Sequence, residues 1–188
     1  MKVVAFNGSP RKDGNTTTLI RRLLHGLERE GIETELVQLS EKEIRGCIAC
    51  YKCFENLDRR CAVKTDAANE YIVKIMGASG VVLGSPVYFQ DVTPEMKALI
   101  DRAGFVGLAN GKMYRNKVGS ALACFRRSGG MHAIETMNHF FLSNELIIAG
   151  RVLGVGKEKG DVGRDTEGME IADTLGQRMA WIMKRLDE

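Results

Sequence analysis

The sequence lacks the features of a membrane-bound or nucleic-acid-binding protein. No apolar stretch approaches the length needed to cross a bilayer, and Met1-Lys2 leads directly into a short strand-like run instead of a signal peptide. The 27 basic and 24 acidic residues leave a net charge of only +3, and the basic residues are dispersed among the acidic ones. We therefore expect a soluble, cytoplasmic protein that binds neither membrane nor nucleic acid.

Several catalytic motifs are missing as well. No Lys-Ser or Lys-Thr pair follows a glycine at P-loop spacing, and no GxGxxG is present, which excludes the usual fingerprints for nucleoside triphosphates and dinucleotides. The three histidines share no metal-ligand spacing, and no Ser-His-Asp order is recognisable. The sequence therefore disfavours hydrolysis, whether by a histidine-bound metal or by a catalytic triad.

The pattern of hydrophobic residues predicts an α/β fold. With 188 residues, of which 44% are hydrophobic, the chain has the size of one globular domain, spanning 1–188 with a cysteine-rich insertion at about 45–65. Apolar runs at 3–6 and 81–83 are typical of central parallel strands, whereas the alternation over 32–39 is typical of a strand at or near a sheet edge. Further strands are expected at 117–124 and within 146–155, and helices after residue 18 and over 66–79, 94–102, 131–143 and 167–186. Five strands alternating with helices predict a three-layer sandwich around a parallel sheet.

The loop at 8–18, which follows the first strand, predicts a phosphate-binding site. Its glycines, hydroxyls and cationic side chains lead into a helix, and backbone N–H groups at a helix N-terminus favour an anion. The alternative is that this segment contains only a turn and a helix N-cap, but a cap requires a single such residue. The candidate phosphate ligands are Ser9, Arg11, Asn15, Thr16 and Thr17.

Two further loops follow the third and fourth strands, at 84–90 and 125–130. In open parallel sheets ligands bind outside the carboxyl ends of the strands, so these loops and the phosphate loop are expected to share one site. The second loop offers flat or aromatic surfaces, and the third offers hydrogen-bond donors for ring carbonyls. A phosphate site beside aromatic walls and ring-facing donors is what flavin mononucleotide (FMN) requires. The candidate ring contacts are Pro86, Val87, Tyr88 and Phe89 in the second loop and Arg126, Ser128, Gly129 and Gly130 in the third.

These motifs carry a resemblance to a known family. Gly8-Ser9-Pro10-Arg11 with Gly14-Asn15-Thr16, Ser85-Pro86-Val87-Tyr88, Met96-Lys97 and Ile100-Asp101-Arg102 resemble segments of the flavodoxin-like NADPH-dependent FMN reductase family, over nearly the whole chain. The added cysteine motif is similar to that of its iron–sulfur flavoprotein branch. The resemblance implies a flavodoxin-like five-stranded sheet of order 2-1-3-4-5, tightly bound FMN, and a homodimer or homotetramer with the flavin near a subunit interface. It also implies that the first loop holds the FMN phosphate and that the second borders the isoalloxazine.

Four of the five cysteines, Cys47, Cys50, Cys53 and Cys61, form the pattern CxxCxxCx7C. Four thiolates so close together suit one cubane cluster or, less well, one tetrahedral zinc ion. Ala62 follows the last cysteine, whereas a ferredoxin would have proline there, so the pattern is not that of a ferredoxin. The resemblance implies a [4Fe-4S] cluster that passes single electrons between a donor protein and FMN. Related FMN reductases carry CxxCxxC without a cluster, so reduced or disulfide-linked thiols remain the alternative. Cys124, at the end of a strand, is expected in the core.

The sequence thus predicts an FMN-dependent oxidoreductase, which takes a hydride from NAD(P)H and passes electrons to a quinone, a flavin, a metal ion or another small acceptor. No catalytic side chain is required, because the flavin carries the redox chemistry. One alternative is an iron–sulfur flavoprotein that receives single electrons from a ferredoxin-like donor through the cluster. Another is a flavodoxin-like module that binds a ligand without catalysis.

Overall fold

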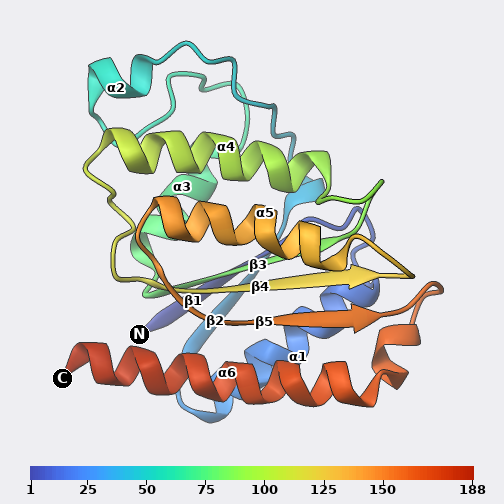
Figure 1. Cartoon of the computed structure of the whole chain (residues 1–188). Coiled ribbons are helices and arrows are strands. Elements are labelled where there is room, and N and C mark those ends of the chain that lie inside the picture. The colour runs from blue at the N-terminus through green and yellow to red at the C-terminus, as the bar shows by residue number, and fades with distance from the viewer.

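The computed structural model describes residues 1–188 and contains one five-stranded sheet (Figure 1). Its order is β2-β1-β3-β4-β5, and every neighbouring pair is parallel. The flavodoxin-like order predicted from the sequence is confirmed, as is the edge position of the alternating strand β2. The strands are β1 (Lys2–Asn7), β2 (Glu33–Gln38), β3 (Gly80–Pro86), β4 (Val118–Phe125) and β5 (Ile147–Val155).

Helices cover both faces of the sheet, which gives the three predicted layers. Helices α1 and α6 lie on one face, and α3, α4 and α5 lie on the other (Figure 1). No helix combines the length and apolar character that a membrane span requires. The helices are α1 (Asn15–Arg29), α2 (Lys52–Asn56), α3 (Ala68–Gly77), α4 (Pro94–Ala109), α5 (Gly130–Ser143) and α6 (Thr166–Asp187), with short 3-10 turns η1 (Leu39–Glu41) and η2 (Asp161–Arg164).

Helix α4 is about two turns longer than the sequence predicts, since it continues past Arg102 to Ala109. The extension contains Gly104 and Gly107, which weaken a helix that has no tertiary support. Here the neighbouring side chains supply that support. A methyl group on Gly107 would lie 2.7 Å from the Tyr114 ring, so the missing side chain lets this ring pack directly against the helix. The additional turns also carry part of the surface against which the cysteine segment packs.

A buried polar network fixes the loop that follows β1. The Asn7 amide donates to Thr17 Oγ1 and to Gln38 Oε1, both at 2.8 Å, and its oxygen accepts from the Ser9 N–H at 3.0 Å. Thr93, the N-cap of α4, donates its hydroxyl to the Gly8 carbonyl at 2.9 Å. Because every one of these groups is buried and paired, the loop conformation is set before any ligand binds.

The cysteine segment, 42–67, forms no strand and contains only the short helix α2. It lies over α4 on the outer side of the α3–α5 layer (Figure 1). Non-glycine residues adopt left-handed backbone conformations at Ala49, Tyr51, Leu57 and Arg59. Such conformations are costly for side-chain-bearing residues and are retained where a loop must wrap around something specific.

Candidate functional site

A cleft of about 210 Å³ opens at the edge of the sheet where β1, β3, β4 and β5 end. All three loops predicted from the sequence contribute to it, because the carboxyl ends of parallel strands meet at one edge. The predicted residues that line the cleft are Ser9, Arg11, Asn15, Thr16, Pro86, Val87, Tyr88 and Arg126.

One end of the cleft has the structure of an anion site. Helix α1 begins there with no capping side chain and no acidic residue in its first turn, and the N–H groups of Asn15, Thr16 and Thr17 make no backbone hydrogen bond. These free amides and the positive end of the helix dipole point to one place. Ser9 and Arg11 lie beside it, so the geometry suits a single phosphate group.

Two predicted phosphate ligands use their side chains differently. The Asn15 amide donates to the Glu158 carbonyl at 2.9 Å and accepts from the Gly160 N–H at 2.9 Å, so it braces the loop after β5. The Thr17 hydroxyl donates to the Lys12 carbonyl at 2.7 Å, and its side chain does not line the cleft. What both residues present to an anion is their backbone N–H.

The other end of the cleft is a wall for a flat ring system. Pro86, Val87 and Tyr88 come from the loop after β3, and Phe125 comes from the end of β4. Phe89, predicted to border the ring, is instead fully exposed with a left-handed backbone and lies outside the lining. The wall is therefore shorter than the sequence predicts.

Three predicted residues of the third loop support the wall without lining it. Ser128 accepts from Gln90 Nε2 at 3.2 Å, which ties the second and third loops together. Gly129 has a φ of 83°, a conformation that glycine adopts freely, and a methyl group there would lie 2.7 Å from Val87. A methyl group on Gly130 would lie 2.7 Å from the Phe125 ring. Both glycines thus permit close packing behind the ring wall.

The loop after β5 also lines the cleft, which the sequence analysis missed. It contributes Gly156, Lys157 and Lys159, so that with Arg11 and Arg126 the lining contains four cationic side chains and no carboxylate. Only Lys157 has an ion-pair partner among these, Glu158 at 3.0 Å. The position of this loop could have indicated its role, because it leaves the same edge of the sheet as the other three loops.

Cys124 lies in the floor of the cleft as well as in the core where the sequence placed it. Burial raises the pKa of its thiol to about 12, although a hydrogen bond with Thr16 acts in the opposite direction. The group is therefore a neutral thiol at physiological pH and serves as an apolar contact.

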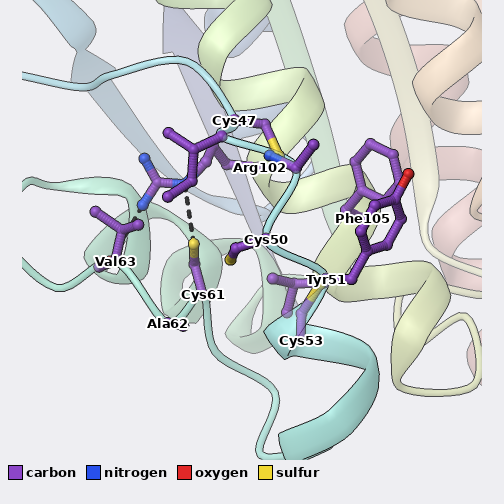
Figure 2. Close-up of a pocket in the computed structure, with 12 residues that line it drawn as sticks. Cys47, Cys50, Tyr51, Cys53, Cys61, Ala62, Val63, Arg102 and Phe105 are labelled. Carbon is purple, nitrogen blue, oxygen red and sulfur yellow. Dashed lines mark hydrogen bonds between the residues drawn. The ribbon is translucent and has the colours of Figure 1, made fainter.

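The remaining four cysteines line a second hollow, between the cysteine segment and α4 (Figure 2). Its cavity volume is about 30 Å³, much smaller than that of the cleft, and its lining contains no imidazole or carboxylate. Cys47 and Cys50 are exposed, Cys53 is half-buried, Cys61 is buried, and all four are free thiols. No group of three or more candidate ligands is gathered tightly enough for a single metal ion. A cubane takes one thiolate at each of its four iron atoms, and four cysteines with no competing ligand match that donor set.

Cys61 is the most firmly held of the four. Its N–H donates to Asn69 Oδ1 at 2.8 Å, and its carbonyl accepts from Asn69 Nδ2 at 3.0 Å. Its sulfur accepts from Arg102 Nε at 3.0 Å (Figure 2). The other three cysteines lie on the exposed loop and α2, in the segment with the left-handed residues.

Comparison with known proteins identifies the family. Residues 1–160 match the family described as NADPH-dependent FMN reductase. The chain belongs to this family. It is 40% identical to the iron–sulfur flavoprotein MJ1083 of Methanocaldococcus jannaschii, over 98% of each chain, and 31% identical to MJ0731 of the same organism, again over 98% of each. It is also 31% identical to an iron–sulfur flavoprotein of Methanosarcina thermophila, over 80% of this chain and 78% of that one. The resemblance to the iron–sulfur flavoprotein branch is thereby confirmed.

Solved structures agree on the fold. RosB, with bound 8-demethyl-8-formylriboflavin-5'-phosphate, superposes with a TM-score of 0.80 at 18% identity, covering 100% of this chain and 80% of its own. An archaeal flavodoxin superposes with a TM-score of 0.63 at 16% identity, over 98% and 99%. As a member of the NADPH-dependent FMN reductase family, the protein is an FMN-containing oxidoreductase. The anion site and ring wall of the cleft have the chemistry that this cofactor requires.

Replacing Arg11 by glutamine is expected to weaken FMN binding at least about tenfold, because a charge-assisted hydrogen bond to phosphate contributes roughly 1.5–3 kcal/mol. Quenching of FMN fluorescence by the apoprotein measures the affinity. The matched control is Lys12→Gln, since Lys12 is paired with Glu41 at 2.9 Å and does not line the cleft. Equal losses in the two variants would contradict a specific role for Arg11.

Proposed function

We propose that the protein is an iron–sulfur flavoprotein, with FMN in the cleft and a [4Fe-4S] cluster held by Cys47, Cys50, Cys53 and Cys61. The observation that carries this proposal is that all four cysteines of the motif line one apolar hollow that offers no competing ligand. Free thiols without a cluster would not need four sulfurs around a single space. The names of the relatives agree with it. Transfer of single electrons through a cluster, which was one alternative in the sequence analysis, is therefore the function that we prefer.

The role of each cleft residue follows from its position in this proposal. Ser9, Arg11 and the first-turn amides of α1 bind the phosphate, while Pro86, Val87 and Tyr88 border the isoalloxazine. FMN held by these residues would supply redox chemistry in one- and two-electron steps, which suits transfer between a cluster and a small acceptor. No side chain of the chain is required to transfer a proton in this scheme. The protein holds the isoalloxazine, supplies positive charge in the cleft and restricts access of solvent.

A second candidate function is reduction of the flavin by a nicotinamide dinucleotide. The family description supports it, and so does the charge of the cleft. Arg11, Arg126, Lys157 and Lys159 provide more positive charge than one phosphate monoester needs. A phosphorylated donor such as NADPH would be attracted to the same opening. The acceptor in this case would be a quinone, a free flavin or a metal ion.

The test is anaerobic purification followed by assays of iron, FMN and rapid reduction. We expect four irons and one FMN per chain and fast flavin reduction by a reduced ferredoxin. FMN with almost no iron would eliminate the cluster. Fast bleaching by NADPH together with slow reduction by ferredoxin would favour the second candidate. Colourless protein that takes up no added FMN would contradict both.

Assembly into a homodimer or homotetramer is part of the same proposal. Exposed aromatic rings of Tyr51, Phe54 and Phe105 meet on the outside of the cysteine segment, with centroids 6.2 Å apart. An apolar cluster of this kind suits contact with another protein surface. Light scattering of the purified holoprotein measures the number of chains, and a monomer would refute this part.

A further inference from the structure

The guanidinium of Arg102 contacts the candidate cluster ligand Cys61 from within the protein. Arg102 lies on α4 and its side chain is only 2% exposed. Its Nε donates to Cys61 Sγ at 3.0 Å, and Figure 2 shows this contact at the inner wall of the hollow. The contact is a direct N–H···S hydrogen bond from a cationic donor to the sulfur.

The other donors of Arg102 determine its orientation. Nη1 donates to Asp66 Oδ2 at 2.8 Å and to the Arg45 carbonyl at 2.9 Å. Nη2 donates to Asp66 Oδ1 and to the Val63 carbonyl, both at 3.2 Å. These contacts come from both sides of the cysteine motif, so one side chain joins the two ends of the segment to α4. Because these bonds hold Nη1 and Nη2 in place, the orientation of the guanidinium directs Nε at the sulfur.

Arg102 and Asp66 form a buried pair of opposite charges. The guanidinium of Arg102 is charged because arginine keeps its proton in proteins. Burial acts to raise the pKa of Asp66, yet the bonds from Arg102 and from backbone N–H groups hold it below its usual range. Asp66 neutralises the guanidinium, and its side chain is 1% exposed. A buried arginine paired with one carboxylate needs no thiol to balance it, so the contact with Cys61 calls for a separate explanation.

We propose that Arg102 is a positioning residue for the cluster, which fixes Cys61 as a ligand and raises the reduction potential by donating its Nε–H to the ligand sulfur. This inference rests on the proposed function. Because a reduced cluster would carry more negative charge on its sulfurs than an oxidised one, a fixed donor at Cys61 would stabilise the reduced state more. Only arginine can bind Asp66 with a two-pronged fork and still offer a third N–H to the sulfur.

The experiment compares the wild-type holoprotein with Arg102→Lys and Arg102→Gln in redox titrations of the cluster monitored by electron paramagnetic resonance. At a fixed applied potential, we expect the ratio of reduced to oxidised cluster to fall about tenfold, which corresponds to ~59 mV for one electron. The midpoint of FMN, bound in a cleft that shares no lining residue with the hollow, should not move. The matched control is Lys97→Gln, an exposed position on the same helix.

The outcomes distinguish a failure of the proposed function from a failure of the role proposed for Arg102. Wild-type protein without iron would overturn the proposed function. Wild-type protein with a cluster whose potential is the same in both variants would overturn only the role of Arg102. If neither variant folds, wild-type protein carrying ¹⁵N in its arginine guanidinium groups provides the test. Pulsed resonance of the reduced cluster should then detect a coupled ¹⁵N, and its absence would overturn the inference.

Discussion

Replacing Cys61 by serine is expected to lower bound iron at least about tenfold while FMN content stays unchanged. Serine offers a hydroxyl where the cluster needs a thiolate, and Cys61 is buried and fixed by Asn69 and Arg102, so a water molecule cannot readily take its place. FMN should be retained because the hollow and the cleft have no lining residue in common. Iron and flavin assays on anaerobically purified protein measure both quantities.

The matched control for this experiment is Cys124→Ser. Cys124 is a buried thiol like Cys61, but it lies in the floor of the cleft and outside the cysteine hollow. We expect the Cys124 variant to keep its iron. If it lost as much iron as the Cys61 variant, the loss would reflect general destabilisation and the four-cysteine assignment would fail.

The second large effect concerns stability and the layer formed by α1 and α6. Replacing Gly26 by alanine is expected to lower the free energy of unfolding by about 2–3 kcal/mol. The new methyl group would lie 2.4 Å from the Asp173 carbonyl oxygen and 3.3 Å from the Gly176 Cα, both on α6. Because these are backbone atoms, the helices must separate, and this cost exceeds the gain of about 1 kcal/mol in helix propensity. Urea denaturation monitored by circular dichroism measures the difference.

Gly77→Ala is the matched control for this prediction. Gly77 is also helical, in the last turn of α3, but a methyl group there meets no atom within 4 Å. The variant should be neutral or slightly more stable, because alanine restricts the unfolded chain. Equal destabilisation at both sites would mean that the close approach of α1 and α6 is not what requires Gly26.

Much of the fold could be predicted because hydrophobic patterns act locally. The continuous apolar run of β1 identified a central strand, and the alternation in β2 identified an edge strand. Helix α4 was predicted too short, because Gly104 and Gly107 carry an unfavourable propensity that only the Tyr114 ring and neighbouring side chains offset. Local propensity carries no information about such partners.

The site was predictable to a smaller extent. The sequence indicates which loops meet, since strand direction alone brings their ends to one edge. It does not indicate which side chains turn inward. Asn15 and Thr17 have the right chemistry for phosphate, but their side chains form hydrogen bonds with the protein itself. Lys157 and Lys159 line the cleft from a loop that the sequence did not assign to the site.

The sequence by itself determined the alternation of five strands with helices, the anion-binding character of the loop after β1 and the presence of four closely spaced cysteines. These properties depend on residue type and spacing along the chain. Only the tertiary structure decided that the four cysteines line one hollow, that this hollow is separate from the cleft, and that Arg102 donates to Cys61. Those relations join residues that are far apart in the chain, such as Arg102 and Cys61 at 41 positions, and they depend on how the helices pack.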